Sequence, residues 1–292
     1  MKYEKTASNR IFDTTLIVLL SILAVITLYP YYNVVVSSFS NAVELYNGSK
    51  LVLLPKGFNY DSYRIVFRNP ILLTSYLNTF IYVVLGTLVN MLMNIFGAYS
   101  LSKRYLPGMK VFMKLIVFTM FFSGGMIPTF LLVYELQMID SIWAMILPNA
   151  VATMNIIIMR TYFIGMDPAI EESARMDGAH DFTILFKIIL PLAKPVLAVI
   201  TLYYAVGHWN SFFDALLYLR TRSKFPLQII LREILIYNNK TLTSGQGVYE
   251  DTQAVSESVK YALIVVSTVP ILCLYPYLQK HFVKGIMIGS IK

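Results

Sequence analysis

The sequence predicts an all-α polytopic membrane protein with six transmembrane helices, and its composition is the first observation behind this prediction. Of its 292 residues, 57% are hydrophobic and only 14% are charged, and the mean hydropathy is +0.63. Soluble domains have about 45–50% apolar and about 25% charged residues. Six apolar stretches are long enough to cross a bilayer, which takes about 20 residues. Together they occupy most of the chain, so no large soluble domain is expected.

The net charge of +8 and the single cysteine, Cys273, agree with this class of protein. Lys and Arg gather at membrane–water boundaries, so the basic excess does not indicate nucleic-acid binding. One cysteine allows no intrachain disulfide and no thiolate metal cluster. The first apolar run follows a short basic segment, but it is longer than the 7–15 residues of a signal peptide's apolar region, so we predict an uncleaved first span.

The first three predicted spans are about residues 14–36, 73–99 and 111–134. A polar loop at 37–70 follows the first span, and it contains turn signals and a possible short surface helix at 60–67. The second span has Asn and Thr residues among its apolar positions. The third contains Ser-Gly-Gly and Pro128, which predict a bend or local unwinding. Broken backbone at membrane depth must be buried in protein or line a cavity.

The last three predicted spans are about residues 141–163, 196–217 and 261–278. A charged insert separates the fourth span from the fifth. The loop at 218–260 begins with apolar residues at helical spacing, so 226–237 is predicted to be an amphipathic helix at the outer membrane surface. The remainder of this loop, 238–257, is polar and is expected to be exposed, either as a passive loop or in contact with a partner.

Six spans place both termini on the same side of the membrane. The segments predicted on that side contain 13 Lys and Arg residues, against ten in the other three loops, and at higher density. The positive-inside rule therefore places both termini in the cytoplasm. The predicted organisation is a cytoplasmic N-terminus (1–13), a transmembrane domain (14–278) with outer loops at 37–70 and 218–260, and a cytoplasmic tail (279–292).

The insert at 167–191 is predicted to form an elbow of two short helices outside the bilayer. Asp167 can cap the first helix and Pro168 suits its first position, while Gly178 can end it with a positive φ. Asp181 can cap a second helix at 182–190, and prolines at 191 and 195 break the path into the fifth span. A helix this short is unstable alone and must dock on something.

Charge indicates what this elbow docks on. Residues 167–181 carry five acidic residues and one Arg. An interfacial helix resting on anionic headgroups would instead carry Lys and Arg on its polar face. The acidic elbow therefore favours a basic groove on a partner protein.

The elbow resembles the EAA loop of ABC importer permease subunits. Glu172-Ser173-Ala174 is followed after three residues by Gly178 and after nine more by Ile188-x-Leu190-Pro191. The family pattern is E-A-A, x3, G, x9, I-x-L-P, and Ser173 is the one departure. The resemblance implies a type I ABC importer permease fold in which this loop is the cytoplasmic coupling helix, seated in a cleft of the ATPase subunit. It implies coupling roles for Glu172, Ser173, Ala174, Arg175, Asp177, Gly178, Leu190 and Pro191.

The resemblance covers nearly the whole chain. Asn78-Thr79, residues 98–104 and Trp209-Asn-Ser-Phe-Phe-Asp214 are similar to carbohydrate-uptake permeases of the maltose-permease G type. The ending at 279–292 resembles the branch that imports oligosaccharides, including uronate-containing and alginate-type ones. The family implies a multi-pass protein of a prokaryotic cytoplasmic membrane. Its partners would be a second, non-identical permease subunit, two ATP-binding subunits and an extracytoplasmic solute-binding protein.

This chain is not expected to be an enzyme or to bind a cofactor or metal. It has no G-x-x-x-x-G-K-[ST] phosphate loop, so ATP and Mg would be bound by the partner ATPase subunits. Polar groups inside spans are candidates to line a substrate pathway, with interhelical hydrogen bonding as the alternative for each. These candidates are Asn78, Asn94, Asn149, Asn155, His208, Trp209, Asn210 and Asp214.

Two other functions stay open at this point. The EAA loop is shared by ABC permeases for other solutes, such as amino acids or phosphonates. A stand-alone secondary transporter is a different class of protein, in which the polar residues inside the spans would be the coupling sites.

Overall fold

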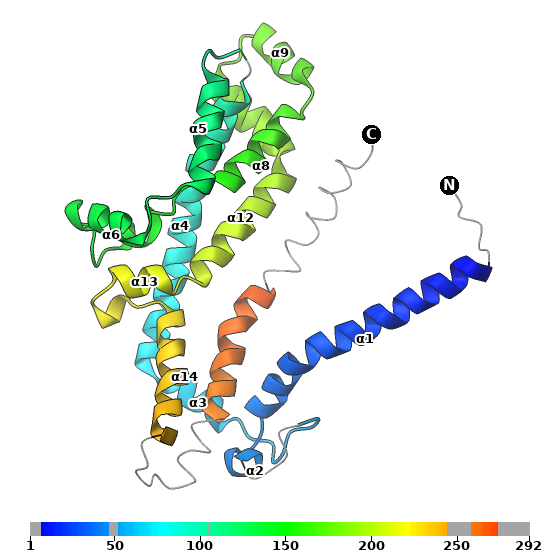
Figure 1. Cartoon of the computed structure of the whole chain (residues 1–292), viewed down its shortest axis with the longest axis vertical. Coiled ribbons are helices and arrows are strands. Elements are labelled where there is room, and N and C mark those ends of the chain that lie inside the picture. Colours follow the sequence, from blue (N-terminus) through cyan, green and yellow to red (C-terminus); the bar gives the residue numbers. More distant parts are fainter. Residues whose placement is uncertain (1–6, 47–51, 104, 244–257, 274–292) are drawn as a thin grey trace. The chain divides into compact units, whose positions relative to one another are not determined.

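The structure, a computed structural model, describes the whole chain except residues 1–6, 47–51, 104, 244–257 and 274–292. The described residues form helices joined by loops and turns, with no strand among them, which confirms the all-α prediction (Figure 1). They divide into two compact units, one of residues 1–69 and 233–269 and one of residues 70–232 and 270–292. The predicted tail at 279–292 lies outside the described residues, as does most of the polar loop at 238–257.

The first unit contains α1 (Ala7–Ser38), α2 (Ala42–Tyr46) and α3 (Asp61–Arg68). Helix α1 includes the predicted first span, and none of its most apolar 18-residue window is buried inside the protein, as expected of a helix that faces lipid. The helix α3 confirms the short helix expected at 60–67. Its Ser62 hydroxyl donates to Ser258 Oγ over 2.8 Å, which joins it to the helix Ser258–Cys273.

The second unit is arranged along α4 (Pro70–Ser102), which packs against α8 (Thr153–Ile164) and α12 (Lys194–Trp209) (Figure 1). The buried positions of α4 recur every three or four residues and are mostly small or polar. They include Ser75, Thr79, Gly86, Asn90, Asn94 and Ala98. Small residues let apolar helices approach closely in a membrane, where burial of apolar surface gives no driving force. The Asn and Thr residues that interrupt the second span therefore form its packing face.

The third and fourth predicted spans are not single straight helices. The third consists of α5 (Met109–Phe121) and α6 (Met126–Glu135), which differ in direction by 110°. The break contains Gly125 at φ +88°, a conformation open to glycine, so the predicted interruption is confirmed. The fourth consists of α7 (Ile142–Ile146), a non-helical stretch and then α8.

The fifth predicted span also ends early. Helix α12 stops at Trp209, and the separate α13 (Phe213–Tyr218) follows. The helix predicted at 226–237 is present as α14 (Leu227–Thr243), but Leu227, Ile229 and Ile230 are at most 3% exposed. The first turns of this helix are therefore buried in protein, and its place at the outer membrane surface stays a prediction. An apolar stripe on a helix fits either environment, which is why the sequence does not distinguish them.

The helix Ser258–Cys273 lies in the predicted sixth span, whose last residues are outside the described part. Two described helices, Asn9–Ser38 and Pro70–Ser102, are each long and apolar enough to cross a membrane alone. If each of two bent helix pairs is counted as one span, that number among the described residues is four. The total of six crossings stays a prediction.

Candidate functional site

Helix α9 (Pro168–Met176) begins as the sequence predicts. The Asp167 carboxylate accepts a hydrogen bond from the Ala169 N–H over 3.0 Å. This satisfies one of the amide groups that the first turn leaves without an internal partner. Pro168 follows at the first helical position, where its missing N–H removes no hydrogen bond.

Helix α9 also ends as predicted, at a left-handed glycine. Gly178 has φ +80°. Its N–H donates to the Arg175 carbonyl over 3.0 Å, and the next N–H, of Ala179, donates to the Ala174 carbonyl over 3.0 Å. This pair of bonds is the Schellman motif, which closes a helix on a residue of positive φ. The elbow is thus fixed by the chain's own local chemistry.

The second half of the elbow differs in detail from the prediction. Helical structure begins at Asp181 as α10 (Asp181–Thr183) and continues as the π-helical η1 (Ile184–Ile189) and α11 (Leu190–Leu192). The Asp181 side chain does not cap this helix and instead accepts a hydrogen bond from Arg175 over 2.6 Å. The helix runs through Pro191, and the chain bends by 84° between Leu192 and Lys194.

The two faces of α9 have different surroundings. Ala174 is 7% exposed and belongs to a core cluster with Phe163 and Ile184. Glu172 and Ser173 are exposed. Met176 is 88% exposed, although it lies within the motif, and the sequence reading did not single it out. The exposed surface of α9 thus carries an acidic side chain, Glu172, and an apolar one, Met176, one helical turn apart.

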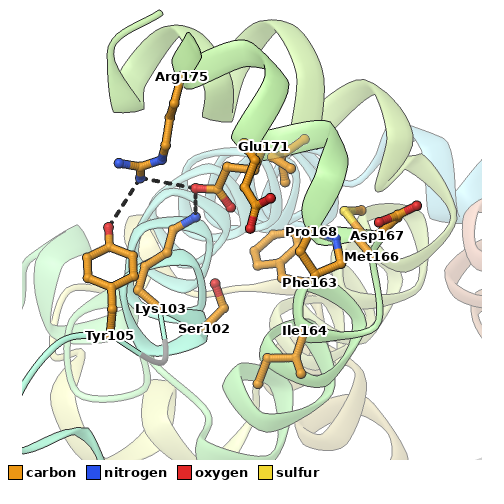
Figure 2. A pocket seen from close by; sticks show the side chains of 12 residues that line it. Ser102, Lys103, Tyr105, Phe163, Ile164, Met166, Asp167, Pro168, Glu171 and Arg175 are labelled. Carbon is orange, nitrogen blue, oxygen red and sulfur yellow. Dashed lines mark hydrogen bonds and ion pairs between the residues drawn. The ribbon is translucent and has the colours of Figure 1, made fainter.

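Of the two neighbouring acids on α9, Glu171 rather than Glu172 forms ion pairs (Figure 2). Its Oε1 accepts hydrogen bonds from Lys103 Nζ, from Arg175 Nη2 over 3.2 Å and from the Tyr99 hydroxyl over 3.3 Å. Lys103 also lies 3.8 Å from the centre of the Tyr99 ring. Within the described residues Glu172 forms no ion pair. The carboxylate of Glu172 therefore has no ionic partner within the described residues, while Glu171 connects α9 to the end of α4.

The protonation of Glu171 follows from this network. Burial raises its pKa, but the hydrogen bond and charge of Lys103, with those of Arg175, outweigh this effect, so the net pKa is lowered. Glu171 is therefore ionised at neutral pH. Sequence reasoning did not assign it a role, because the lysine that pairs with it is far away in the chain. The only sequence signal for Glu171 is its position next to Glu172 of the motif.

Arg175 forms hydrogen bonds to three side chains of its own subunit. Its guanidinium donates to the Tyr105 hydroxyl over 3.2 Å, besides its bonds to Glu171 and Asp181. Of the other residues predicted for coupling, Asp177 and Pro191 are exposed and Leu190 is half-buried against the core cluster. The charged residues of the elbow thus divide into a set joined by ion pairs, which is Glu171, Arg175 and Asp181, and a set that forms none within the described residues, which includes Glu172 and Asp177.

A cavity of about 550 Å³ lies beneath the first turns of α9 (Figure 2). Its walls come from the end of α4, the end of α8, α9 and η1. They include Lys103, Phe163, Pro168, Glu171, Glu172 and Ile189. The N-terminal half of α9 is therefore not packed tightly on the bundle.

Four of the predicted pathway residues are turned into the bundle. Asn94, Asn155 and His208 are each at most 8% exposed. Asn94 donates to the Asn90 carbonyl and the Tyr204 hydroxyl. Asn78 is half-buried and donates to the Ser223 and Phe225 carbonyls over 2.7 and 3.1 Å. The ring of His208 hydrogen-bonds to Asn90 Oδ1 of α4. Asn78, Asn94 and His208 thus form contacts between separate segments, which was the alternative to lining a pathway.

The other four lie around the breaks in the fourth and fifth spans. The exposed Asn149 donates to Asp214 Oδ2 over 2.9 Å, which joins the two breaks. Asn210 is exposed, whereas Trp209 is buried with its ring edge-on to Tyr76. The proposed cluster at 208–214 is therefore divided, because α12 ends at Trp209 and the side chains point to different neighbours.

Asn90 is a central polar residue that the pathway set omitted. It is fully buried, and its amide donates to the Asn149 and Ala150 carbonyls over 2.9 and 2.8 Å. The Tyr204 hydroxyl accepts the Ala152 N–H over 3.0 Å. These side chains satisfy the backbone groups left free where the fourth span is unwound, as hydrocarbon surroundings require.

Long apolar helices, interrupted spans and an exposed, charged elbow are typical of a helical membrane permease. The chain belongs to the family described as binding-protein-dependent transport system inner membrane component, whose sequence pattern matches residues 104–288. It is therefore a transport subunit of an ABC importer of the inner membrane.

Relatives and a solved structure match almost the full chain. It is 42% identical to the polygalacturonan/rhamnogalacturonan transport system permease protein YtcP of Bacillus subtilis (strain 168), over 97% of this chain and 99% of that protein. It is 27% identical to the arabinooligosaccharides transport system permease protein AraQ of Halalkalibacterium halodurans, over 99% of both chains. It is 37% identical to a chain from the crystal structure of a bacterial ABC transporter involved in the import of the acidic polysaccharide alginate. That match has a TM-score of 0.85 and covers 96% of this chain and 99% of that one.

Proposed function

We propose that this chain is the G-type permease subunit of an ATP-driven importer for acidic, uronate-containing oligosaccharides. Two similar proteins support the acidic class, since YtcP is described as a permease for polygalacturonan and rhamnogalacturonan and the solved transporter is involved in the import of the acidic polysaccharide alginate. The shared identity of 42% and 37% extends over nearly the whole chain. Substrate would cross by alternating access, as the spans rock between inward-facing and outward-facing states.

The single observation that carries the coupling role is the exposed pair of side chains on α9, one acidic and one apolar. Glu172 is exposed and forms no ion pair with the described part of its own chain, and Met176 beside it is 88% exposed. An acidic and an apolar group side by side suit a groove that offers a basic side chain and an apolar wall. In this proposal the groove belongs to the ATPase subunit.

The same proposal assigns the partners and the orientation. The elbow faces the cytoplasm, both termini lie on that side, and the loops at 37–70 and 218–260 face outward. A second, non-identical permease completes the transmembrane pathway, two ATPase subunits bind ATP and Mg²⁺, and an extracytoplasmic binding protein delivers the sugar. This chain then hydrolyses no ATP itself, consistent with its lack of a phosphate-loop motif.

The test is a Glu172→Lys variant of the chain in its native membrane. The variant should lose the co-purifying ATPase and the ATP-dependent uptake of a galacturonate trisaccharide. Its thermal unfolding should stay unchanged, because the side chain is exposed. Glu135→Lys is the matched control, since it reverses another exposed acid at the end of α6.

Three outcomes contradict parts of this proposal. Normal ATPase binding and uptake in the Glu172→Lys variant would remove the role of Glu172. A wild-type chain that brings down no ATPase and still transports after ATP depletion would be a secondary transporter. Uptake of neutral maltotriose in preference to the galacturonate trisaccharide would overturn the acidic substrate class.

A further inference from the structure

Helix α9 is joined to the rest of its unit at few points. Its buried residue, Ala174, lies in the second half of the helix and packs into the core cluster. The first half stands over the cavity of about 550 Å³. Across that gap, the ionic contact of Glu171 with Lys103 connects α9 to the end of α4 (Figure 2).

Lys103 is unusual for a lysine at the end of a helix. Its side chain is 8% exposed, and it is held by Glu171 and by the face of the Tyr99 ring. A buried ammonium group is costly unless it is paired, so the pair resists separation. Glu171 is itself 24% exposed, so water weakens the contact only in part. A displacement of Glu171 therefore acts on Lys103.

The end of α4 is in turn tied to the neighbouring span. Arg160 of α8 donates from Nε to the Leu101 carbonyl over 2.8 Å. Farther along α4, Asn90 holds the unwound stretch of the fourth span and pairs with His208 of α12 over 2.7 Å. Movement of α4 thus reaches the breaks of two spans through hydrogen bonds and packed side chains.

We propose that the Glu171–Lys103 pair is the link that transmits displacement of α9 to α4, so that Glu171 is a positioning residue for transport. The proposal rests on the coupling role of α9 proposed above. The proposal gives the two neighbouring acids different roles. Glu172 contacts the ATPase, and Glu171 transmits the displacement of α9 to α4. Loss of the pair leaves α9 docked but only loosely connected to the bundle.

The first test compares Glu171→Gln and Lys103→Met in the assembled importer with its binding protein, in proteoliposomes. Both variants should keep the ATPase subunits bound and keep hydrolysing ATP. The ratio of galacturonate trisaccharide transported to ATP hydrolysed should fall by about tenfold. The double variant should fall no further than either single variant, because both remove the same interaction. Glu135→Gln is the matched control, since it neutralises an exposed acid at the end of α6, outside the elbow, that Lys103 does not contact.

The second test measures the motion itself and needs no substrate. Cys273, the chain's one cysteine, is replaced by Ser. Spin labels are then placed at two exposed positions, Ala169 on α9 and Leu88 in the middle of α4. The distance between the labels is measured in the assembled importer, without nucleotide and with AMP-PNP and Mg²⁺. In the wild-type background the two helices should move together, so this distance should stay the same.

In the Glu171→Gln background the distance between the labels should change when AMP-PNP binds, because α9 then moves without α4. An unchanged distance and an unchanged transport ratio in Glu171→Gln would overturn the link, even though the ATPase stays bound. If the unmutated chain instead binds no ATPase, the proposed coupling function itself fails. The two failures are therefore distinguishable.

Discussion

The imidazole of His208 on α12 occupies the space that Gly86 on α4 leaves open. A Cβ atom added at Gly86 would overlap the ring, and all three of its nearest atoms belong to His208. The ring in turn hydrogen-bonds to Asn90 Oδ1 over 2.7 Å. Close approach at this glycine therefore positions a polar contact between the two helices.

Gly86→Ala tests this relationship. Overpacking a close contact costs about 1–3 kcal/mol, while alanine in place of glycine adds up to about 1 kcal/mol of helix propensity. We expect the cost to exceed the gain, because the ring is fixed by Asn90 and cannot withdraw freely. Thermal unfolding of the purified chain in detergent should shift to lower temperature. Gly97→Ala is the control on the same helix, since its Cβ would meet Ile156 at 3.5 Å, an ordinary contact, and its unfolding temperature should not fall.

The elbow shows what local sequence can predict. Asp167, Pro168 and Gly178 act on backbone groups within a few residues of themselves, so their effects follow from residue type and spacing. The apolar runs predicted the helical class in the same way. Their breaks were recognised where Gly or Pro stood in the run, as in the third span.

The contacts between distant segments were not predictable in this way. Glu171 pairs with Lys103 rather than with a residue of its own loop alone, and no local pattern encodes that choice. Asn78 and Asn94 are polar side chains of the kind expected to line a pathway, yet their amides donate to other segments, Asn78 to the Ser223 carbonyl and Asn94 to the Tyr204 hydroxyl. An amide in a span has the same sequence signature in both roles, and only the packing distinguishes them.

Asn90→Leu tests the support of the unwound stretch in the fourth span. The leucine side chain has the same number of heavy atoms, branched at the same position, but it forms no hydrogen bond, so the Asn149 and Ala150 carbonyls and the His208 ring lose their partner. Leaving a buried polar group unpaired costs about 1–3 kcal/mol, and we expect a lower unfolding temperature together with reduced transport.

Thr87→Val is the matched control for this variant. Thr87 Oγ1 is buried and has no hydrogen-bond partner among the described residues. Its removal should therefore leave the unfolding temperature unchanged or raise it. Equal stability of Asn90→Leu and the wild type would show that the unwound stretch does not depend on Asn90.

Asp140 fixes a second long-range connection, outside the predicted spans. Its carboxylate accepts hydrogen bonds from the Arg220 and Thr221 N–H groups over 3.0 Å and from Lys224 Nζ over 2.8 Å. The bonds from Lys224 and Thr221 hold the pKa of Asp140 well below its usual range. The charged form of this side chain therefore stabilises the folded chain.

Asp140→Asn removes the charge and keeps the backbone conformation, because Asp140 has φ +59° and asparagine tolerates that region. A partly exposed ion pair contributes about 0–1 kcal/mol, and hydrogen bonds to a charged group contribute about 1.5–3 kcal/mol. We expect the variant to lose roughly 1–2 kcal/mol of unfolding free energy at neutral pH.

The pH dependence of this difference follows from the lowered pKa of Asp140 in the folded chain. A carboxylate with a lowered folded pKa contributes its full stabilisation above its unfolded pKa of about 4, and this contribution is lost as the pH falls further. The stability difference between wild type and variant should accordingly be constant from pH 7 to about 5 and shrink between about pH 4 and 3. A difference that persists unchanged at pH 3 would show that the charge of Asp140 does not hold this connection.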